Sequence, residues 1–383
     1  MISIFTFAQW IQQPTPTNYN LYSIFFTDAN TGYAVGDVGT ILKTTNGGLN
    51  WYSLTAGPNN PLNSIYFPDA DTGYIVGSND VVLKTPNGGS TWFVNSTGTG
   101  NLLNSVYFTN NNTGYTVGTN GIISKTINGG TNWITLDDPI TNNLLSVYFP
   151  DPNVGYAVGE NSIILKTING GTTWSVLSSG TNLFMSVYFT DINIGYVVGD
   201  IGTILKTING GITWTTLASG TTIGLTSVYF SDSNTGYVVG GGGTILKTMN
   251  GGANWITLPS GTSSNLWSVY FIDDNTGYAV GNTGMILKTN NGGSNFIEET
   301  LTPNSTFTIY PNPANNKIII SNNNKYINET SLSIYNLIGE QVLQNMFRNQ
   351  KRIEINVNTM PKGMYLVKLQ TDAATETKKL VIN

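Results

Sequence analysis

Apolar and polar residues alternate in short runs that recur along the first three hundred residues. Each unit holds four β-rich runs, which read L-x-S-V-Y-F, T-G-Y-x-V-G, G-T-I-L-K-T and W-x-x-L. Gly, Asn and Asp separate the runs, and no window shows the 3.6-residue period of a helix. Each unit therefore predicts four short antiparallel strands joined by tight turns.

The unit occurs seven times at nearly constant spacing. Its tyrosine recurs every 40 or 41 residues, at Tyr33, Tyr74, Tyr115, Tyr156, Tyr196, Tyr237 and Tyr278. An aromatic residue opens the fourth run in the same register, at Trp51, Trp92, Trp133, Trp174, Trp214, Trp255 and Phe296. Seven such units predict an all-β fold, a seven-bladed β-propeller, because each sheet can bury its faces against the next around a closed ring.

Two segments compete for the outermost strand of the seventh blade. Trp10–Pro14 lies 41 residues before Trp51, so it is a fourth strand without its first three. Phe296–Glu298 is the fourth strand of the last repeat. We favour Trp10, because closure by the N-terminus joins the first blade to the last.

A polar turn precedes each of these aromatic residues, as in Thr44-x-Asn46-Gly47-Gly48-x-Asn50-Trp51. Asn-Gly between strands predicts a type I′ turn, and the Thr and Asn side chains can bond its backbone. The motif resembles the Asp-box of bacterial neuraminidase-type repeats, with Asn in place of Asp; in that family it is a structural turn remote from catalysis. Over residues 10–300 the whole repeat resembles propellers related to the photosystem II stability and assembly factor. That resemblance implies the fold and not the function.

Composition excludes several kinds of chemistry. The chain has neither Cys nor His, which removes disulfides, Cys/His zinc sites and every triad that uses imidazole. Residues 1–300 carry seven Lys, no Arg and sixteen Asp or Glu, a net charge of −9, whereas residues 301–383 carry +4. An acidic body argues against nucleic acid or anionic membrane as a partner. No apolar run is long enough to span a membrane, and we expect neither metal nor other cofactor.

The last eighty residues predict a small C-terminal β-sandwich. They contain Tyr310-Pro311-Asn312-Pro313, S-I-Y-N-L-I-G-E-Q-V at Ser333–Val342, M-P-K-G-M-Y-L-V-K-L at Met360–Leu369 and a terminal K-K-L-V-I. This order resembles a type IX secretion system type A C-terminal sorting domain. The resemblance implies that residues 310–383 engage the type IX secretion machinery and that the protein is secreted or held at the outer cell surface.

The N-terminus independently favours export. Residues 1–8 are apolar and end in a small-residue pattern typical of the last half of a signal peptide, although a frayed strand would also fit. The expected organisation is thus a truncated signal peptide at 1–8, the propeller at 9–300, a linker at 301–309 and the sorting domain at 310–383.

Candidate ligand-binding residues lie where the repeats differ most. The position before the repeated serine opens the inner strand at one mouth of the channel, and its notable members are Tyr22, Asn63, Asn104 and Trp267. Aromatic rings and amides suit a sugar or a peptide, although drift at a non-core position would look the same. If they bind, Tyr22 and Trp267 belong to one site, since ring closure makes repeats one and seven neighbours.

Acidic residues on the same rim offer a second possibility. Asp137, Asp138, Glu160 and Asp200 fall in neighbouring blades and could form an acidic sector able to run glycoside hydrolysis, or they could be solvated turn residues. Sialidase chemistry is excluded more firmly, because it needs a cluster of Arg side chains and residues 1–300 contain no Arg. Asp28-x-Asn30-x-Gly32 and its equivalents echo a calcium loop but lack its glutamate, so we interpret them as Asx-turns. One lysine per repeat, such as Lys43, is expected to neighbour the Asp of that turn.

These observations favour a non-enzymatic, exported propeller that acts as a binding module. A carbohydrate-active hydrolase that uses the acidic sector is the alternative, and a purely structural surface protein is a third.

Overall fold

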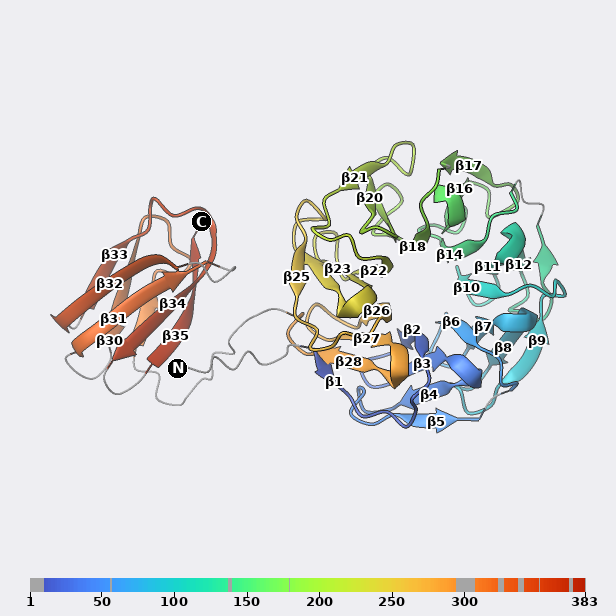
Figure 1. Ribbon diagram of the computed structural model, residues 1–383, viewed down its shortest axis with the longest axis horizontal. Coiled ribbons are helices and arrows are strands. Elements are labelled where there is room, and N and C mark those ends of the chain that lie inside the picture. Colours follow the sequence, from blue (N-terminus) through green and yellow to red (C-terminus); the bar gives the residue numbers. More distant parts are fainter. Residues whose placement is uncertain are drawn as a thin grey trace. The chain divides into compact units, whose positions relative to one another are not determined.

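The computed structural model describes residues 10–55, 57–136, 140–178, 180–293, 307–322, 327–336, 341–350, 352–371 and 375–382 (Figure 1). The chain divides into two compact units, Met1–Ser294 and Asn295–Asn383. The described part contains β-strands and short 3₁₀ turns and no α-helix. The predicted signal-peptide residues 1–8 lie outside the described residues.

The first unit is a ring of seven four-stranded antiparallel sheets, with one edge strand of each sheet nearest the centre (Figure 1). The inner strands are β2 (Leu21–Phe26), β6 (Leu62–Tyr66), β10 (Leu103–Phe108), β14 (Leu144–Tyr148), β18 (Phe184–Phe189), β22 (Leu225–Phe230) and β26 (Leu266–Phe271). The second strands are β3 (Gly32–Gly36), β7 (Gly73–Gly77), β11 (Gly114–Gly118), β15 (Gly155–Gly159), β19 (Gly195–Gly199), β23 (Gly236–Gly240) and β27 (Gly277–Gly281).

The third strands are β4 (Ile41–Thr44), β8 (Val81–Thr85), β12 (Ile123–Thr126), β16 (Ile164–Thr167), β20 (Ile204–Thr207), β24 (Ile245–Thr248) and β28 (Ile286–Thr289). The outer strands are β5 (Tyr52–Leu54), β9 (Phe93–Ser96), β13 (Ile134–Thr135), β17 (Ser175–Ser178), β21 (Thr215–Leu217), β25 (Ile256–Leu258) and β1 (Ile11–Gln12). In six blades a 3₁₀ turn joins the second and third strands: η1 (Asp37–Gly39), η2 (Ser78–Asp80), η3 (Thr119–Gly121), η4 (Glu160–Ser162), η5 (Gly241–Gly243) and η6 (Asn282–Gly284).

The N-terminus closes the ring, as we favoured. Strand β1 pairs antiparallel with β28, Ile11 opposite Lys288, and so completes the blade of β26, β27 and β28. Trp10 is almost fully buried there and meets the Phe271 ring edge-on, with centroids 5.8 Å apart. The competing residue Phe296 lies outside the described residues. Blades one and seven are thereby joined through the terminal strand as well as through packing.

The blades bury their faces against one another. All five residues of every second strand are buried, including the repeated tyrosine, which has no exposed surface in any of the seven blades. Gly32 shows why glycine opens this strand: a Cβ there would come within 2.5 Å of the Phe26 ring. The core is therefore a chain of seven clusters, each shared by two neighbouring blades.

The polar turn before each outer strand is built as the sequence predicts, with one change. Thr44 Oγ1 accepts from Gly48 N at 2.9 Å, and Asn46 Oδ1 accepts from Asn50 N at 3.0 Å. The positive φ angles fall on Gly47 and Gly48, at 65° and 77°, rather than on Asn46 and Gly47. The Asx-turn is also confirmed, since Asp28 Oδ1 accepts from Asn30 N and Thr31 N. Both motifs are accounted for as turns.

The sequence predicts that the lysine of each third strand lies beside the Asp of the neighbouring turn, and the structure corrects this. Lys43 Nζ donates instead to Gly88 O, at 2.6 Å, in the polar turn of the next blade, and Tyr33 Oη donates to the same oxygen at 2.7 Å. The same lysine bond recurs around the ring and closes with Lys288 on Gly47 O. Burial lowers the pKa of Lys43. A main-chain carbonyl is thus the partner, and the lysines join blades.

The C-terminal unit is a β-sandwich of two antiparallel sheets (Figure 1). One sheet holds β29 (Phe307–Tyr310), β30 (Lys317–Asn322) and β33 (Arg352–Asn356), and the other holds β32 (Gln341–Gln350), β31 (Ile327–Tyr335), β34 (Gly363–Thr371) and β35 (Thr375–Ile382). Residues of both sheets, among them Ile318, Ile353, Leu332 and Val367, share one buried cluster. Asn312 of the Tyr-Pro-Asn-Pro motif donates to Lys379 O and accepts from Val381 N, so it fastens the terminal strand.

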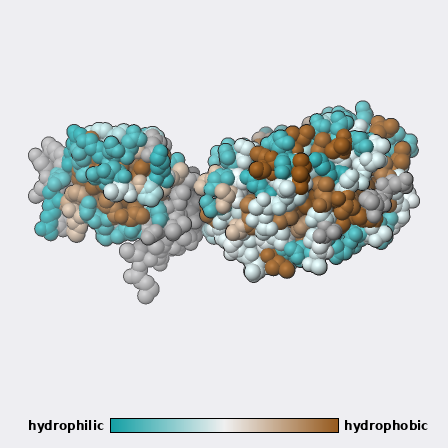
Figure 2. All heavy atoms as spheres, turned by 90° about the horizontal axis from the view of Figure 1, so that it is seen from above, coloured by the Kyte–Doolittle hydropathy of each residue, from teal (hydrophilic) through white to brown (hydrophobic). Residues whose placement is uncertain are grey.

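Exposed apolar side chains gather in clusters on the side of the propeller seen in Figure 2. Across the propeller, exposed apolar residues belong mainly to outer strands and to the polar turns. The five most exposed are Ile212, Ile168, Ile208, Ile201 and Ile127, of which Ile201 lies between β19 and β20. None of these five lies on an inner strand. Apolar exposure alone therefore does not mark the channel mouth.

Candidate binding site at the channel mouth

Ring closure brings Tyr22 and Trp267 into contact, as predicted. Their ring centroids lie 5.9 Å apart with planes at 71°, although 245 residues separate them in sequence. Tyr22 Oη donates to Asp37 Oδ1 at 2.9 Å, and Trp267 Nε1 donates to Asn282 Oδ1 at 2.6 Å. Burial, together with the bond to Asp37, raises the pKa of Tyr22. The first 3₁₀ turn and the last thus hold a half-buried aromatic pair at the mouth.

The side chains of the two asparagines of the predicted site bond to main-chain carbonyls of the next blade. Asn63 Nδ2 donates to Leu103 O at 2.9 Å, and Asn104 Nδ2 donates to Leu144 O at 2.8 Å. Thr226 repeats the bond in the sixth blade, with its hydroxyl on Leu266 O. At these three positions the side chain therefore ties one inner strand to the next. Each of the two amide nitrogens thus has a partner within the ring.

Two of the four residues of the predicted acidic sector, Glu160 and Asp200, lie in the described part of the structure. Asp137 and Asp138 lie outside the described residues. Glu160 accepts from Asn143 Nδ2 at 2.9 Å, and Asp200 accepts from Leu183 N at 3.1 Å, so each is fixed to its own blade. Among the described residues no three acidic side chains come together in a way that could hold a metal ion.

Asp80 on the same rim has a structural role that the sequence did not show. It stands at φ 60°, in the turn position that glycine holds in five other blades, and only 4% of it is exposed. Its carboxylate accepts from the hydroxyls of Ser96, Thr97 and Thr99 and from the amides of Gly98 and Thr99. Burial raises its pKa, but the side-chain and backbone donors outweigh burial and lower it. Asp80 therefore anchors the link to the third blade.

Sequence reasoning missed a belt of aromatic residues deeper in the channel. We call it the channel girdle: Phe25, Tyr66, Tyr107, Tyr148, Tyr188, Tyr229 and Tyr270, one from each inner strand. Neighbouring ring centroids lie between 4.9 and 5.4 Å apart all the way round. All seven side chains keep some exposed surface. The signal was the near-invariant tyrosine of S-V-Y-F, which we had interpreted only as part of the inner strand.

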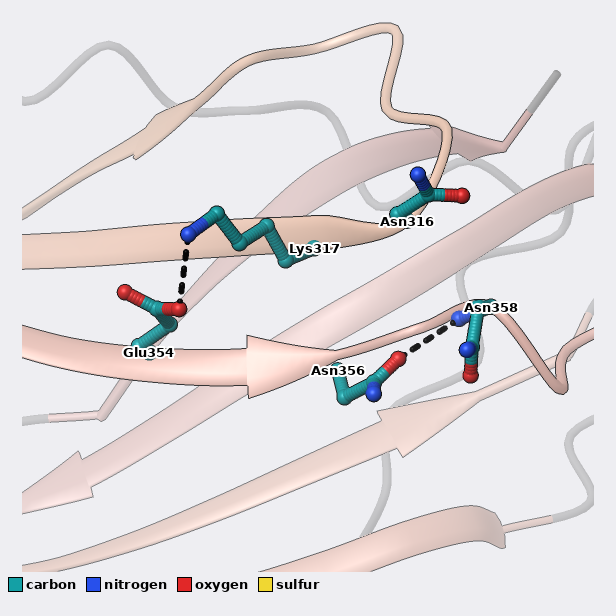
Figure 3. A pocket seen from close by; sticks show the side chains of 5 residues that line it. All are labelled: Asn316, Lys317, Glu354, Asn356 and Asn358. Carbon is teal, nitrogen blue, oxygen red and sulfur yellow. Dashed lines mark hydrogen bonds and ion pairs between the residues drawn. The ribbon is translucent and has the colours of Figure 1, made fainter.

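A hollow on the C-terminal unit is less suited to recognition than the aromatic pair. It has a volume of about 520 Å³ and is lined by Asn316, Lys317, Glu354, Asn356 and Asn358 (Figure 3). Lys317 Nζ and Glu354 Oε1 form an ion pair at 2.9 Å across it, and both side chains are more than half exposed. A solvated ion pair among asparagines offers little apolar surface, so we do not assign a ligand to it.

Comparison with known proteins accounts for both units. The family described as Secretion system C-terminal sorting domain matches residues 308–383. The family described as Photosynthesis system II assembly factor YCF48 matches residues 2–96, 51–138, 95–183, 132–219 and 215–290. Comparison with curated proteins found no match. No described residues form a helix long and apolar enough to cross a membrane.

Solved structures resemble the propeller in fold. "YCF48 bound to D1 peptide" is 22% identical with a TM-score of 0.64, and covers 74% of this chain and 95% of its own. "YCF48 from Cyanidioschyzon merolae" is 24% identical with a TM-score of 0.63, and covers 73% and 98%. The WD40 propeller domain of Doa1 is 12% identical with a TM-score of 0.59, and covers 74% and 97%. At these identities the likeness concerns the fold alone.

The sorting domain indicates export through the type IX secretion system to the cell surface or the extracellular space. The repeat matches together run from residue 2 to residue 290, well over half of the chain. The protein is therefore an exported seven-bladed propeller that belongs to the photosystem II assembly factor YCF48 family and ends in a secretion system C-terminal sorting domain.

Proposed function

We propose that the propeller is a non-enzymatic binding module that takes a peptide at the channel mouth. The observation that carries this proposal is the Tyr22–Trp267 contact, because two half-buried rings with fixed polar ends form a ready-made recognition surface. The aromatic pair is specific to the junction of the first and last blades, so it offers one site in a sevenfold ring. One similar propeller is described as bound to D1 peptide, which supports a peptide as the ligand class.

The hydrolase alternative has less support. Retaining and inverting glycosidases both need two carboxyl groups on either side of the scissile bond. Glu160 and Asp200 each accept a hydrogen bond from their own blade, and the other two members of the sector are outside the described residues. Without an observed pair of facing carboxylates, binding is the better explanation of this mouth.

A glycan and peptide array, probed with the full chain, tests the proposal. We expect peptides to be retained unchanged, as judged by mass spectrometry of the eluted ligand. Trp267→Ala should lose them, whereas Lys125→Ala should keep them, because Lys125 bonds Gly170 O at the polar turns. Cleaved glycans would favour the hydrolase, and retention by Trp267→Ala equal to wild type would refute the assignment of the mouth.

A further inference from the structure

The channel girdle is a ring of hydrogen-bond acceptors as well as aromatic rings. Seven centroids about 5 Å apart around a closed ring lie on a circle of radius about 6 Å, so all seven side chains approach a common axis. Six of them carry a phenolic hydroxyl, and Phe25 is the exception. What the girdle can bind depends on where the six hydroxyl protons point.

Four of those protons are given to main-chain carbonyls of the next blade. Tyr107 donates to Phe149 O, Tyr188 to Phe230 O, Tyr229 to Phe271 O and Tyr270 to Phe26 O, at 2.8 to 3.0 Å. A hydroxyl that donates in this way keeps only lone pairs to offer to the channel. Four of the six hydroxyls of the girdle can therefore act only as acceptors toward a ligand.

The two remaining hydroxyls belong to Tyr66 and Tyr148. Their rings lie beside those of Tyr107 and Tyr188, whose own protons are already given to carbonyls. Burial raises the pKa of all six, to about 12 for Tyr188 and Tyr270. The ring therefore stays neutral at physiological pH, and four of its six hydroxyls have no proton left for an incoming acceptor.

We propose that the channel girdle binds a primary alkylammonium group, supplied by a lysine side chain of the peptide at the mouth. An ammonium carries three donors and no acceptor, which complements the four phenolic oxygens whose protons are already given to carbonyls. A cation inside a circle of this radius also lies within the distance at which aromatic rings attract it. This inference rests on the proposed function and names the side chain that the peptide must present.

The charge and shape of the channel agree with that occupant. The first 300 residues carry a net charge of −9, and the seven propeller lysines all bond glycine carbonyls in the polar turns rather than facing the girdle. Phe25 follows Tyr22 by three residues on β2, so mouth and girdle are separated by about 10 Å along the strand. Only a long, narrow group extends from the mouth toward the girdle. The half-buried side chains of Leu145 and Met185 at the mouth can pack on the methylene groups of a lysine side chain.

Titration of the full chain, with ¹³C-labelled tyrosine rings followed by NMR, tests the inference with small probes. n-Butylammonium, which mimics the lysine side chain, should shift the girdle resonances. 1-Butanol has the same length but no charge, and tetramethylammonium has the charge but no N–H donor, so both should bind more weakly. Equal binding of 1-butanol or of tetramethylammonium would overturn the acceptor assignment.

Three variants sharpen the test. Tyr107→Phe/Tyr188→Phe removes two acceptors and should weaken n-butylammonium about tenfold, the scale of hydrogen bonds to a charged group. Phe25→Tyr should strengthen it, because the recurring pattern places the new hydroxyl against Phe67 O and so adds one more oxygen that can only accept. Tyr52→Phe, on the outer strand β5, should change nothing. An unchanged affinity in both girdle variants would overturn the inference.

The two proposals fail separately. If retention of the array peptides depends on Trp267 while n-butylammonium leaves the girdle resonances unmoved, the peptide site at the mouth is supported and the girdle assignment is wrong. If n-butylammonium binds the girdle as described but no peptide is retained, the girdle assignment stands and the proposed function is wrong.

Discussion

Trp10→Ala should destabilise the propeller more than the equivalent change in any other blade that holds a tryptophan in this register. Trp10 is 1% exposed and packs against Phe271, and a Cβ on Gly293 would come within 2.7 Å of its indole nitrogen, so little can collapse into the space it leaves. Removing such a side chain costs about 3–5 kcal/mol. Strand β1 pairs only two residues with β28, and Gln13 N adds one hydrogen bond to Ile286 O. Packing of Trp10 therefore provides most of the stabilisation that closes the ring.

Trp133→Ala supplies the matched control. Trp133 occupies the same register in the third blade and meets Phe108 edge-on at 6.1 Å, but it is only half-buried. We therefore expect a loss of about 2 kcal/mol, which follows from the smaller apolar area removed from contact. Urea unfolding followed by near-UV circular dichroism, which reports tyrosine packing, compares the two variants. Hydrogen exchange should show that Trp10→Ala opens β26, β27 and β28 together.

Two results would refute this reasoning. A loss below about 1 kcal/mol for Trp10→Ala would show that the tryptophan does not hold the ring closed, since a buried tryptophan cannot be removed so cheaply. Equal losses for the two variants, with the seventh blade protected from exchange in both, would show that β1 adds nothing beyond its own hydrophobic contact.

Three further outcomes follow from the described contacts. Asp80→Ala should lower the free energy of unfolding by about 2–3 kcal/mol. Because the pKa of Asp80 in the folded protein lies below its unfolded value of about 4, the stabilisation by Asp80 should be full above pH 4 and vanish as the pH falls through the folded pKa. Unfolding of both proteins, measured over a range of acid pH, checks this difference. Gly202→Ala should be much less stable than Gly242→Ala in thermal unfolding, because its Cβ would lie 2.0 Å from Thr221 O, whereas nothing lies within 4 Å at Gly242. Deletion of residues 303–383, in a chain exported behind an added signal peptide, should leave the propeller in the periplasm by cell fractionation, and undiminished release would contradict the sorting role.

The repeat pattern was sufficient to predict the fold and one feature of the mouth. Seven copies of one strand sequence can bury their faces only against one another, so the ring and the contact of Tyr22 with Trp267 followed from topology without any side-chain detail. The lysine partners could not be predicted in this way. A charge pattern shows possible ion pairs, but it does not show a main-chain carbonyl such as Gly88 O, which is placed by the next blade's turn.

The girdle was missed for a related reason. A tyrosine beside a buried phenylalanine, as Tyr107 stands beside Phe108, has the same pattern whether it fills a core or lines a channel. The distinction lies in its exposed edge and in the direction of its hydroxyl proton, and neither can be recovered from residue types. The role of Asp80 could not be predicted for a similar reason, because the donors that surround it come from the end of β9 and the following link rather than from its own turn.

Affinity of the mouth for its peptide tests the central claim most directly. Isothermal titration of the full chain with the strongest array peptide should show that Trp267→Ala weakens binding by about 1–3 kcal/mol, the scale for losing an aromatic anchor, while its melting temperature barely changes. Lys125→Ala, at the polar turns, should bind as wild type does. If Lys125→Ala abolishes binding while Trp267→Ala binds as wild type, the ligand uses the other rim and the assignment of the mouth is wrong.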